Sequence, residues 1–236
     1  NAGTANQAAL GVLEGPGQAR CRVRGDPNAR DPDGTTAITA FAPDDEGGRV
    51  AYALSRHGSD GQELRVVDVE TGRDLPDSVR WVKFAAIAWL RNGFFYTRFP
   101  TPDSVPPEHA QYLCQVWFHS LGSPQGADRL VYHRPDAPAV VFDVDVTSDG
   151  THLVLTSRPG ASDKAEVHVV DVREPDHLER PPRPLVTGFT DAWHFIDGRA
   201  GRLYFRTDVE APRGRIVCLD VGDPALRSLR SEKWAG

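Results

Sequence analysis

The sequence predicts an all-β fold built from repeated sheets of about four strands each. Helical periodicity is nearly absent from the 236 residues, whereas short segments rich in β-branched and aromatic residues alternate with Gly, Pro and Asp-Gly turn signals. Gly and Pro number 22 and 19, and 39% of the residues are hydrophobic, which describes an ordered, turn-rich chain. The expected strands fall into two sets. The first set comprises residues 49–54, 93–96, 151–155 and 202–205. Each of these is followed by a member of the second set, which comprises residues 64–69, 115–121, 167–172 and 216–221.

The second set of strands recurs at a nearly constant interval. Between Asp68, Ser120, Asp171 and Asp220 the steps are 52, 51 and 49 residues. A period near 50 residues built from short strands is typical of a β-propeller with one four-stranded blade per repeat. The strand pattern excludes a helical solenoid, and the absence of any Trp-Asp dipeptide disfavours the WD-repeat class.

The repeat divides the chain into expected blades over residues 31–82, 83–135, 136–187 and 188–236. Residues 1–30 are interpreted as the outer hairpin of an earlier, incomplete blade. Four and a half blades need not close into a ring, so we expect two apolar end faces that self-association covers. The chain contains no methionine, even at position 1, and is interpreted as a piece of a longer protein.

Composition excludes several classes of partner. The net charge is −6, from 33 acidic and 27 basic residues, which disfavours nucleic acid or an anionic membrane. No apolar run approaches the ~20 residues that a membrane helix needs, and no signal peptide is recognisable. The three cysteines, Cys21, Cys114 and Cys218, lie far apart, so reduced thiols and a cytoplasmic location are expected.

Three patterns could carry chemistry, and each has a plainer explanation. Residues 160–164 approach the Gly-x-Ser-x-Gly elbow of serine hydrolases around Ser162, but Lys164 replaces the last glycine and no helix follows. Residues 145–150 partly match a calcium loop but lack its third-position acid and its later glutamate. The eight histidines fall mostly in strands without a partner at ligand spacing. No metal, cofactor or catalytic residue is therefore expected in this chain.

A series of short sequence motifs, in a fixed order along the chain, resembles a known protein family. They run from residue 1 to about residue 160: Asn1-x-Gly3-x-x-Asn6-Gln7, Asp26-Pro27-Asn28, Asp33-Gly34-Thr35, residues 50–55, Gly58-Ser59-Asp60, residues 70–77, Val82-Lys83-Phe84, Ala88-Trp89, residues 93–96 and residues 121–125. The series resembles the opening propeller repeats of the prolyl oligopeptidase family. That family consists of cytosolic serine peptidases that cleave short peptides after proline, in which a seven-bladed propeller caps an α/β-hydrolase domain with a Ser-Asp-His triad. The resemblance implies that this chain is the gating part, without the hydrolase domain.

The resemblance assigns roles to three positions. Asp60 matches an acid that pairs with an arginine on the catalytic histidine's loop, although Gly61 stands where the family usually has tryptophan. Phe84 matches an aromatic that lines the substrate pocket, with an ordinary core aromatic as the alternative. Arg158, in Ser-Arg-Pro-Gly, matches an arginine near the bound peptide, and Ala161 replaces a cysteine that the family often has. Without partners in this chain, all three charged or aromatic groups are expected to contribute little to stability.

The sequence therefore predicts the substrate-gating propeller of a serine peptidase that acts on short proline-containing peptides, with the missing hydrolase domain as its partner. The alternative is a stand-alone propeller that binds other proteins, which would need a closed ring and a groove at its rim. A third possibility is an enzyme with its site in the propeller channel. For that reading, Asp143 and Asp145 are the candidate acids.

Overall fold

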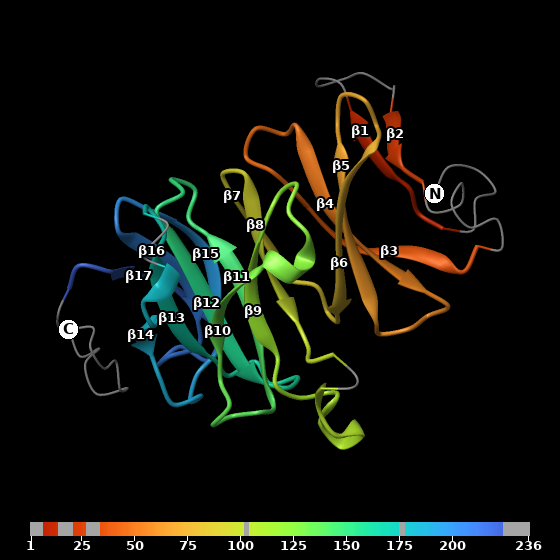
Figure 1. Ribbon diagram of the computed structural model, residues 1–236. Helices are drawn as coiled ribbons and strands as arrows, with labels where there is room; N and C mark the ends of the chain where they lie inside the picture. The colour runs from red at the N-terminus through yellow and green to blue at the C-terminus, as the bar shows by residue number, and fades with distance from the viewer. Residues whose placement is uncertain (1–6, 14–20, 27–33, 102–103, 175–177, 224–236) are drawn as a thin grey trace. The chain divides into compact units, whose positions relative to one another are not determined.

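The computed structural model describes residues 7–13, 21–26, 34–101, 104–174 and 178–223, and these are organised almost entirely as strands (Figure 1). The chain begins with a two-stranded pair, and the four larger sheets that follow, numbered first to fourth in chain order, contain three or four strands each. The bounds are β1 Leu10–Leu13, β2 Cys21–Gly25, β3 Thr36–Pro43, β4 Arg49–Arg56, β5 Gln62–Asp68, β6 Asp74–Val82, β7 Ile87–Leu90, β8 Gly93–Arg98, β9 Gln115–Ser120, β10 Arg129–His133, β11 Val140–Val146, β12 His152–Pro159, β13 Glu166–Asp171, β14 Arg183–Val186, β15 Trp193–Arg199, β16 Arg202–Thr207 and β17 Arg215–Asp220. Short 3-10 turns, among them η2 Pro107–His109 and η3 Gln125–Ala127, interrupt the loops.

Within each large sheet the strands lie side by side in chain order. The sheets are β3-β4-β5-β6, β7-β8-β9-β10, β11-β12-β13-β14 and β15-β16-β17. This up-and-down arrangement is that of a propeller blade, and the predicted all-β class is confirmed. Within the described residues the fourth sheet has three strands. β1 pairs with β2 as a hairpin, and its assignment to an incomplete blade stays a prediction, as do the blade boundaries.

The chain divides into two compact units, residues 1–98 with 118–129 and residues 99–117 with 130–236. In the first unit, Trp89 of β7 packs edge-on against Phe94 of β8, with ring centroids 5.4 Å apart. The indole nitrogen of Trp89 also donates to the carbonyl oxygen of Ala42 in β3 at 2.8 Å, so β7 is tied to β3.

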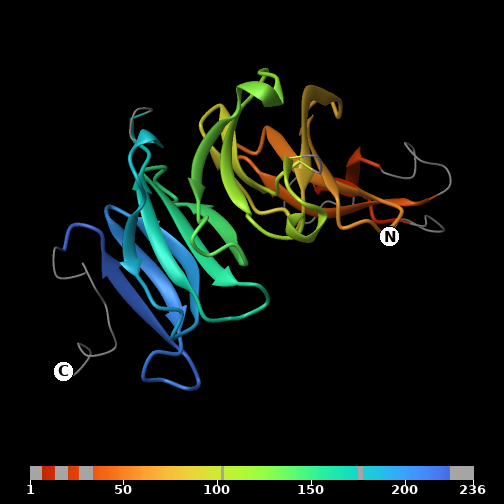
Figure 2. The ribbon, with the colours of Figure 1, turned by 60° about the horizontal axis from the view of Figure 1, so that its bottom comes forward.

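In the second unit the third and fourth sheets pack face to face, as both views show (Figures 1 and 2). Val154 of β12 belongs to one core cluster with Trp193 of β15 and Phe205 of β16. Gly198 of β15 sits where an added Cβ would come within 2.6 Å of side-chain atoms of Leu203 and Thr147. Only glycine allows this close approach.

A buried histidine joins separate segments of the first unit. The His119 side chain on β9 is completely buried. Its Nδ1 lies 2.7 Å from Oδ1 of Asp128, which precedes β10, and its Nε2 lies 3.0 Å from Oδ1 of Asp77 on β6. The hydroxyl of Tyr96 on β8 donates to the other oxygen of Asp128 at 2.7 Å, and the Gly122 backbone N–H donates to Asp77 at 2.6 Å.

This arrangement favours the charged imidazolium form of His119. Both ring nitrogens face carboxylate oxygens, and only the protonated ring can donate from both. Burial by itself lowers the pKa of His119, but the hydrogen bonds and charges of Asp128 and Asp77 outweigh it, so the pKa is raised. The result is a buried ion triad that connects β6, β9 and the loop before β10.

We predict that His119→Ala costs about 3–5 kcal/mol of stability, because it leaves two buried carboxylates without their cation. Because folding raises the pKa of His119, its contribution to the free energy of unfolding is fully present below the unfolded-state pKa of about 6.5. The contribution is lost as the pH rises through the higher folded-state pKa. Urea denaturation between pH 6 and pH 9 should therefore show a decline with pH that the variant lacks. His109→Ala, at an exposed histidine, is the control, and equal slopes for the wild type and His119→Ala would contradict the prediction.

Candidate functional site

The described residues contain no group of three or more His, Cys, Asp or Glu side chains arranged to hold a metal ion. In the same part of the chain, no helix is long and apolar enough to cross a membrane. Ser162 lies in the loop between β12 and β13, where its hydroxyl accepts the Lys164 backbone N–H at 3.1 Å. That contact belongs to the hairpin loop that the sequence predicts at Ser162.

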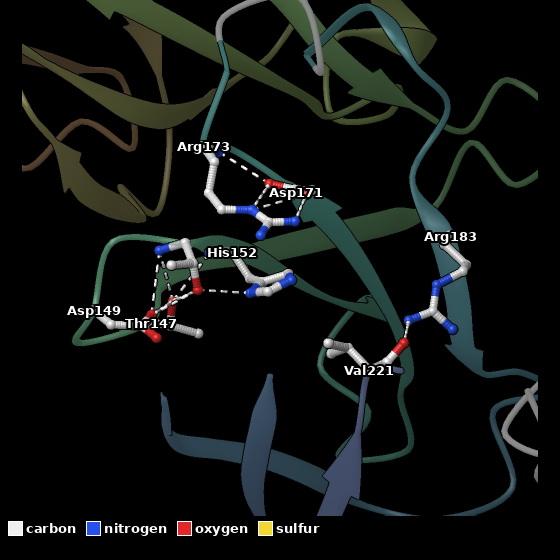
Figure 3. Close-up of polar contacts among 8 residues, drawn as sticks. Thr147, Asp149, His152, Asp171, Arg173, Arg183 and Val221 are labelled. Carbon is white, nitrogen blue, oxygen red and sulfur yellow. Dashed lines mark hydrogen bonds and ion pairs between the residues drawn. The ribbon is translucent and has the colours of Figure 1, made fainter. Parts of the chain in front are cut away.

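Within the calcium-like segment, residues 147–150 form the turn after β11, and Asp149 in this turn has several hydrogen-bond partners (Figure 3). Asp149 accepts hydrogen bonds from the hydroxyls of Thr147 at 2.8 Å and Thr151 at 2.7 Å, and from the Ala200 backbone N–H at 2.7 Å. Desolvation raises the pKa of Asp149, but these hydrogen bonds outweigh it and lower the pKa below its usual range. The turn therefore anchors β15 to β11 and leaves the Asp149 carboxylate occupied.

Figure 3 also shows how the outer parts of the third and fourth sheets are joined. Arg183 of β14 donates to the carbonyl oxygen of Val221, which follows β17. Arg173 pairs with Asp171 at the end of β13. The Arg183–Val221 hydrogen bond and the Lys164–Asp208 ion pair at 2.6 Å connect the third sheet to the fourth, whereas the Arg173–Asp171 pair is local to the end of β13.

Asp60 lies in the turn between β4 and β5 and is exposed. The turn is held by Ser59, whose carbonyl oxygen accepts the Ser55 hydroxyl at 2.6 Å and whose own hydroxyl accepts the Gly61 N–H at 3.0 Å. Among the described residues, none provides a polar contact to the Asp60 carboxylate. The side chain is therefore presented to solvent by a well-ordered turn.

Phe84 follows β6 and is 68% exposed. Phe84 is therefore not packed into a core among the described residues. Its backbone lies in the left-handed region with φ of 50°, and Trp81, which is 44% exposed, has φ of 66°. Bulky residues rarely adopt this conformation, which costs about 1–3 kcal/mol and occurs often at ligand-binding sites.

The strained segment from Arg80 to Ala86 is held by side chains of neighbouring strands and loops. The Gln125 amide accepts the Arg80 backbone N–H at 3.0 Å and donates to the Arg80 carbonyl oxygen at 3.0 Å. After Phe84, the Gln62 side chain accepts the Ala85 backbone N–H at 3.2 Å, and the Thr97 hydroxyl accepts the Ala86 backbone N–H at 3.3 Å. The β5–β6 register also shifts at this point, which marks a bulge at the end of β6. The exposed position of Phe84 is thus imposed by its surroundings.

Arg158 lies on β12 in the second unit and has a partner inside the chain. Its guanidinium contacts the carboxylate of Asp143 on β11. The expectation that all three family-matched residues lack partners is therefore wrong for Arg158. In the register, Arg158 lies opposite Val141, two residues before Asp143, so the pair is a diagonal contact across two antiparallel strands.

Asp145 shares the strand and the face of Asp143 and is only partly exposed. Desolvation by burial, with a smaller contribution from the Asp143 charge, raises the pKa of Asp145 to about 6, while Arg158 opposes the rise. From the sequence, Asp143 and Asp145 were candidates only for an enzyme with its active site in the propeller channel. Their connection to Arg158 was missed, although strand alternation and the β11–β12 hairpin could have suggested it.

We predict that Asp145→Asn stabilises the protein by about 1–2 kcal/mol at pH 7.5, since ionising a desolvated carboxyl costs free energy. The pKa of the Asp145 carboxyl rises on folding to about 6. The ionised carboxyl therefore destabilises the folded protein progressively as the pH rises from the unfolded-state pKa of about 4 through the folded-state pKa. The difference between variant and wild type should vanish near pH 4, as measured by urea denaturation. Asp163→Asn, at an exposed loop carboxylate, is the control. A less stable Asp145→Asn at pH 7.5 would contradict this.

Comparison with known proteins gives a consistent result. The family model described as "Prolyl oligopeptidase, N-terminal beta-propeller domain" matches residues 1–231. Prolyl oligopeptidase A of Galerina marginata (strain CBS 339.88) is 30% identical over 219 residues, which cover 83% of this chain and 29% of the relative. Prolyl endopeptidase of Elizabethkingia meningoseptica is 30% identical over 216 residues, 89% of this chain and 28% of the relative.

A solved structure from a structural and mechanistic analysis of two prolyl endopeptidases superposes with a TM-score of 0.83 at 34% identity. The match covers 95% of this chain and 32% of that one. The described sheets therefore have the propeller architecture of these proteins. The chain spans about three tenths of the length of the relatives that it matches.

Proposed function

Because the chain belongs to the prolyl oligopeptidase N-terminal β-propeller family, we propose that it is the substrate-gating part of a serine peptidase that cleaves short peptides after proline. The match over residues 1–231 carries the proposal, since the named relatives are prolyl peptidases about three times as long. The reaction is acyl transfer to water through a serine nucleophile, and the triad belongs to a hydrolase domain outside this chain.

In this proposal Phe84 and Asp60 face the hydrolase domain. Phe84 lines the substrate pocket, which agrees with its exposure and with the hydrogen bonds that hold its strained backbone. Asp60 pairs with an arginine on the loop of the catalytic histidine, which agrees with its exposed position in an ordered turn. Arg158 contributes to peptide binding together with its partner Asp143. We also propose a cytoplasmic location, which the free thiols of Cys114 and Cys218 support.

We predict that the full-length gene product cleaves a peptide with proline at the scissile position and spares its alanine analogue. Phe84→Ala should lower kcat/KM for the proline peptide about tenfold, because one aromatic contact of about 1.5 kcal/mol is lost. Phe41→Ala is the matched control, since Phe41 is another exposed aromatic, 62% exposed on β3. Absence of proline-dependent cleavage would overturn the proposed activity. Equal effects of the two substitutions would overturn the role of Phe84.

We further propose that the 236-residue chain by itself associates with another copy through the outer face of the fourth sheet. Side chains of β16 and β17 alternate between buried and exposed, and the exposed set includes Tyr204 and Ile216, the latter 70% exposed. Exposed apolar groups on one sheet face favour association with a complementary surface.

For this association we predict a mass above that of the 25.8 kDa monomer at micromolar concentration in light scattering. Ile216→Glu should restore the monomer, because a carboxylate on that face is costly to bury. Tyr112→Glu, at an exposed aromatic outside the sheets, should leave the association unchanged. A monomeric wild type would refute self-association.

A further inference from the structure

One face of the third sheet gathers an unusual set of polar side chains on β11 and β12. In the antiparallel register Asp143 lies opposite Thr156, Asp145 opposite Val154, and Val141 opposite Arg158. Residues directly opposite each other, and residues two apart along a strand, point to the same side of a sheet. Asp143, Asp145, Thr156 and Arg158 therefore share one face, which we call the acidic face.

The charges on the acidic face do not balance. The Arg158 guanidinium contacts Asp143, and this pair neutralises itself. Asp145 has no hydrogen bond or ion pair with any residue in the described part of the chain. When both carboxylates are ionised, two negative charges meet one positive charge, and the excess negative charge lies on the partly buried Asp145.

The acidic face also contains a hydroxyl without a partner. Thr156 is 2% exposed, and its Oγ1 accepts and donates no hydrogen bond among the described residues. Buried polar atoms in folded proteins nearly always have a partner, because leaving one unpaired costs about 1–3 kcal/mol. Its register position opposite Asp143 places the Thr156 side chain on the same face as the two carboxylates, beside Val154, which belongs to the core cluster shared with the fourth sheet. The described residues thus leave both a negative charge and a hydroxyl oxygen unsatisfied.

We propose that the acidic face binds one cationic group, an ammonium or guanidinium, carried by the peptide substrate. Such a group donates several hydrogen bonds, which the Asp145 carboxylate and the Thr156 hydroxyl accept. An anionic group fits poorly, because it would have to displace Asp143 from Arg158 and would leave two carboxylates beside it. The Asp143 side chain is 46% exposed and that of Arg158 23%, so the face is open to solvent at this pair.

This inference rests on the proposed function and specifies its substrate class: proline peptides with a lysine or arginine close to the cleavage site. The sequence resemblance points to a peptide near Arg158, whereas the contacts among the described residues give the surroundings of Arg158 a negative balance. Selectivity arises because a neutral side chain leaves the Asp145 carboxylate unpaired in the bound state, and an acidic one adds repulsion.

The test uses the full-length enzyme and fluorogenic peptides in which lysine, norleucine or glutamate occupies each of the three positions before proline in turn. We expect lysine to exceed norleucine in kcat/KM by about tenfold at one position, equivalent to about 1.4 kcal/mol. Asp145→Asn should reduce that ratio to about one. Asp163→Asn, which removes an exposed carboxylate from the loop after β12, should keep it.

Thr156→Val separates binding from packing, because valine keeps the shape and removes the hydroxyl. If the hydroxyl accepts from the cationic group, the lysine-to-norleucine ratio falls. An unchanged ratio in Asp145→Asn overturns the inference, and so does a preference for glutamate. If Asp145→Asn lowers the denaturation midpoint of the full-length enzyme, opposite to the stabilisation expected for an unpaired Asp145, and leaves the ratio unchanged, the cation comes from another segment of that protein, and the peptide subsite is refuted.

The failure of this inference is distinguishable from the failure of the proposed function. If the norleucine peptides are cleaved after proline and the ratios do not respond to Asp145→Asn, only the cationic subsite is wrong. If no peptide is cleaved, the peptidase proposal and the subsite fall together.

Discussion

A sheet with two apolar faces must be covered on both sides, and the rest of this structure depends on that constraint. Six consecutive residues of β4, from Val50 to Ser55, are buried, and so are five of β8, from Gly93 to Thr97. Strands buried on both faces lose the usual alternation of polar and apolar residues. β16 keeps it, with every second side chain exposed. Continuous burial thus identifies sheets enclosed on both sides, and alternation identifies a sheet covered on one side.

Polar groups inside such covered faces are tolerated where they are paired. The imidazole of His119 has a carboxylate at each nitrogen, and each of those carboxylates has a further donor, Tyr96 or Gly122. Asp145 and Thr156 in the second unit have no such partners among the described residues. The contrast separates a polar cluster that holds the fold from one that is costly until a ligand completes it.

The sequence was sufficient for properties that repeat along the chain. The interval of about 50 residues, the turn signals and the strand composition predicted the sheets and their order, because each strand pairs with its neighbour in sequence. It was insufficient where residues far apart meet. Asp77 lies 42 residues before His119, and nothing in either local pattern indicates the contact. The exposure of Phe84 was equally inaccessible, because it depends on a bulge and on the amide of Gln125 from another loop.

The strained segment after β6 shows how far the fold constrains function. A glycine at position 81 or 84 would adopt a positive φ at little cost, yet the chain has tryptophan and phenylalanine there. Phe84 is 68% exposed and Trp81 44%, so burial in the core does not offset the strain at Phe84. Three side chains of the first unit, Gln62, Thr97 and Gln125, bind the backbone on either side instead. Under the proposed function, the contact that Phe84 makes in the substrate pocket offsets the cost of this conformation.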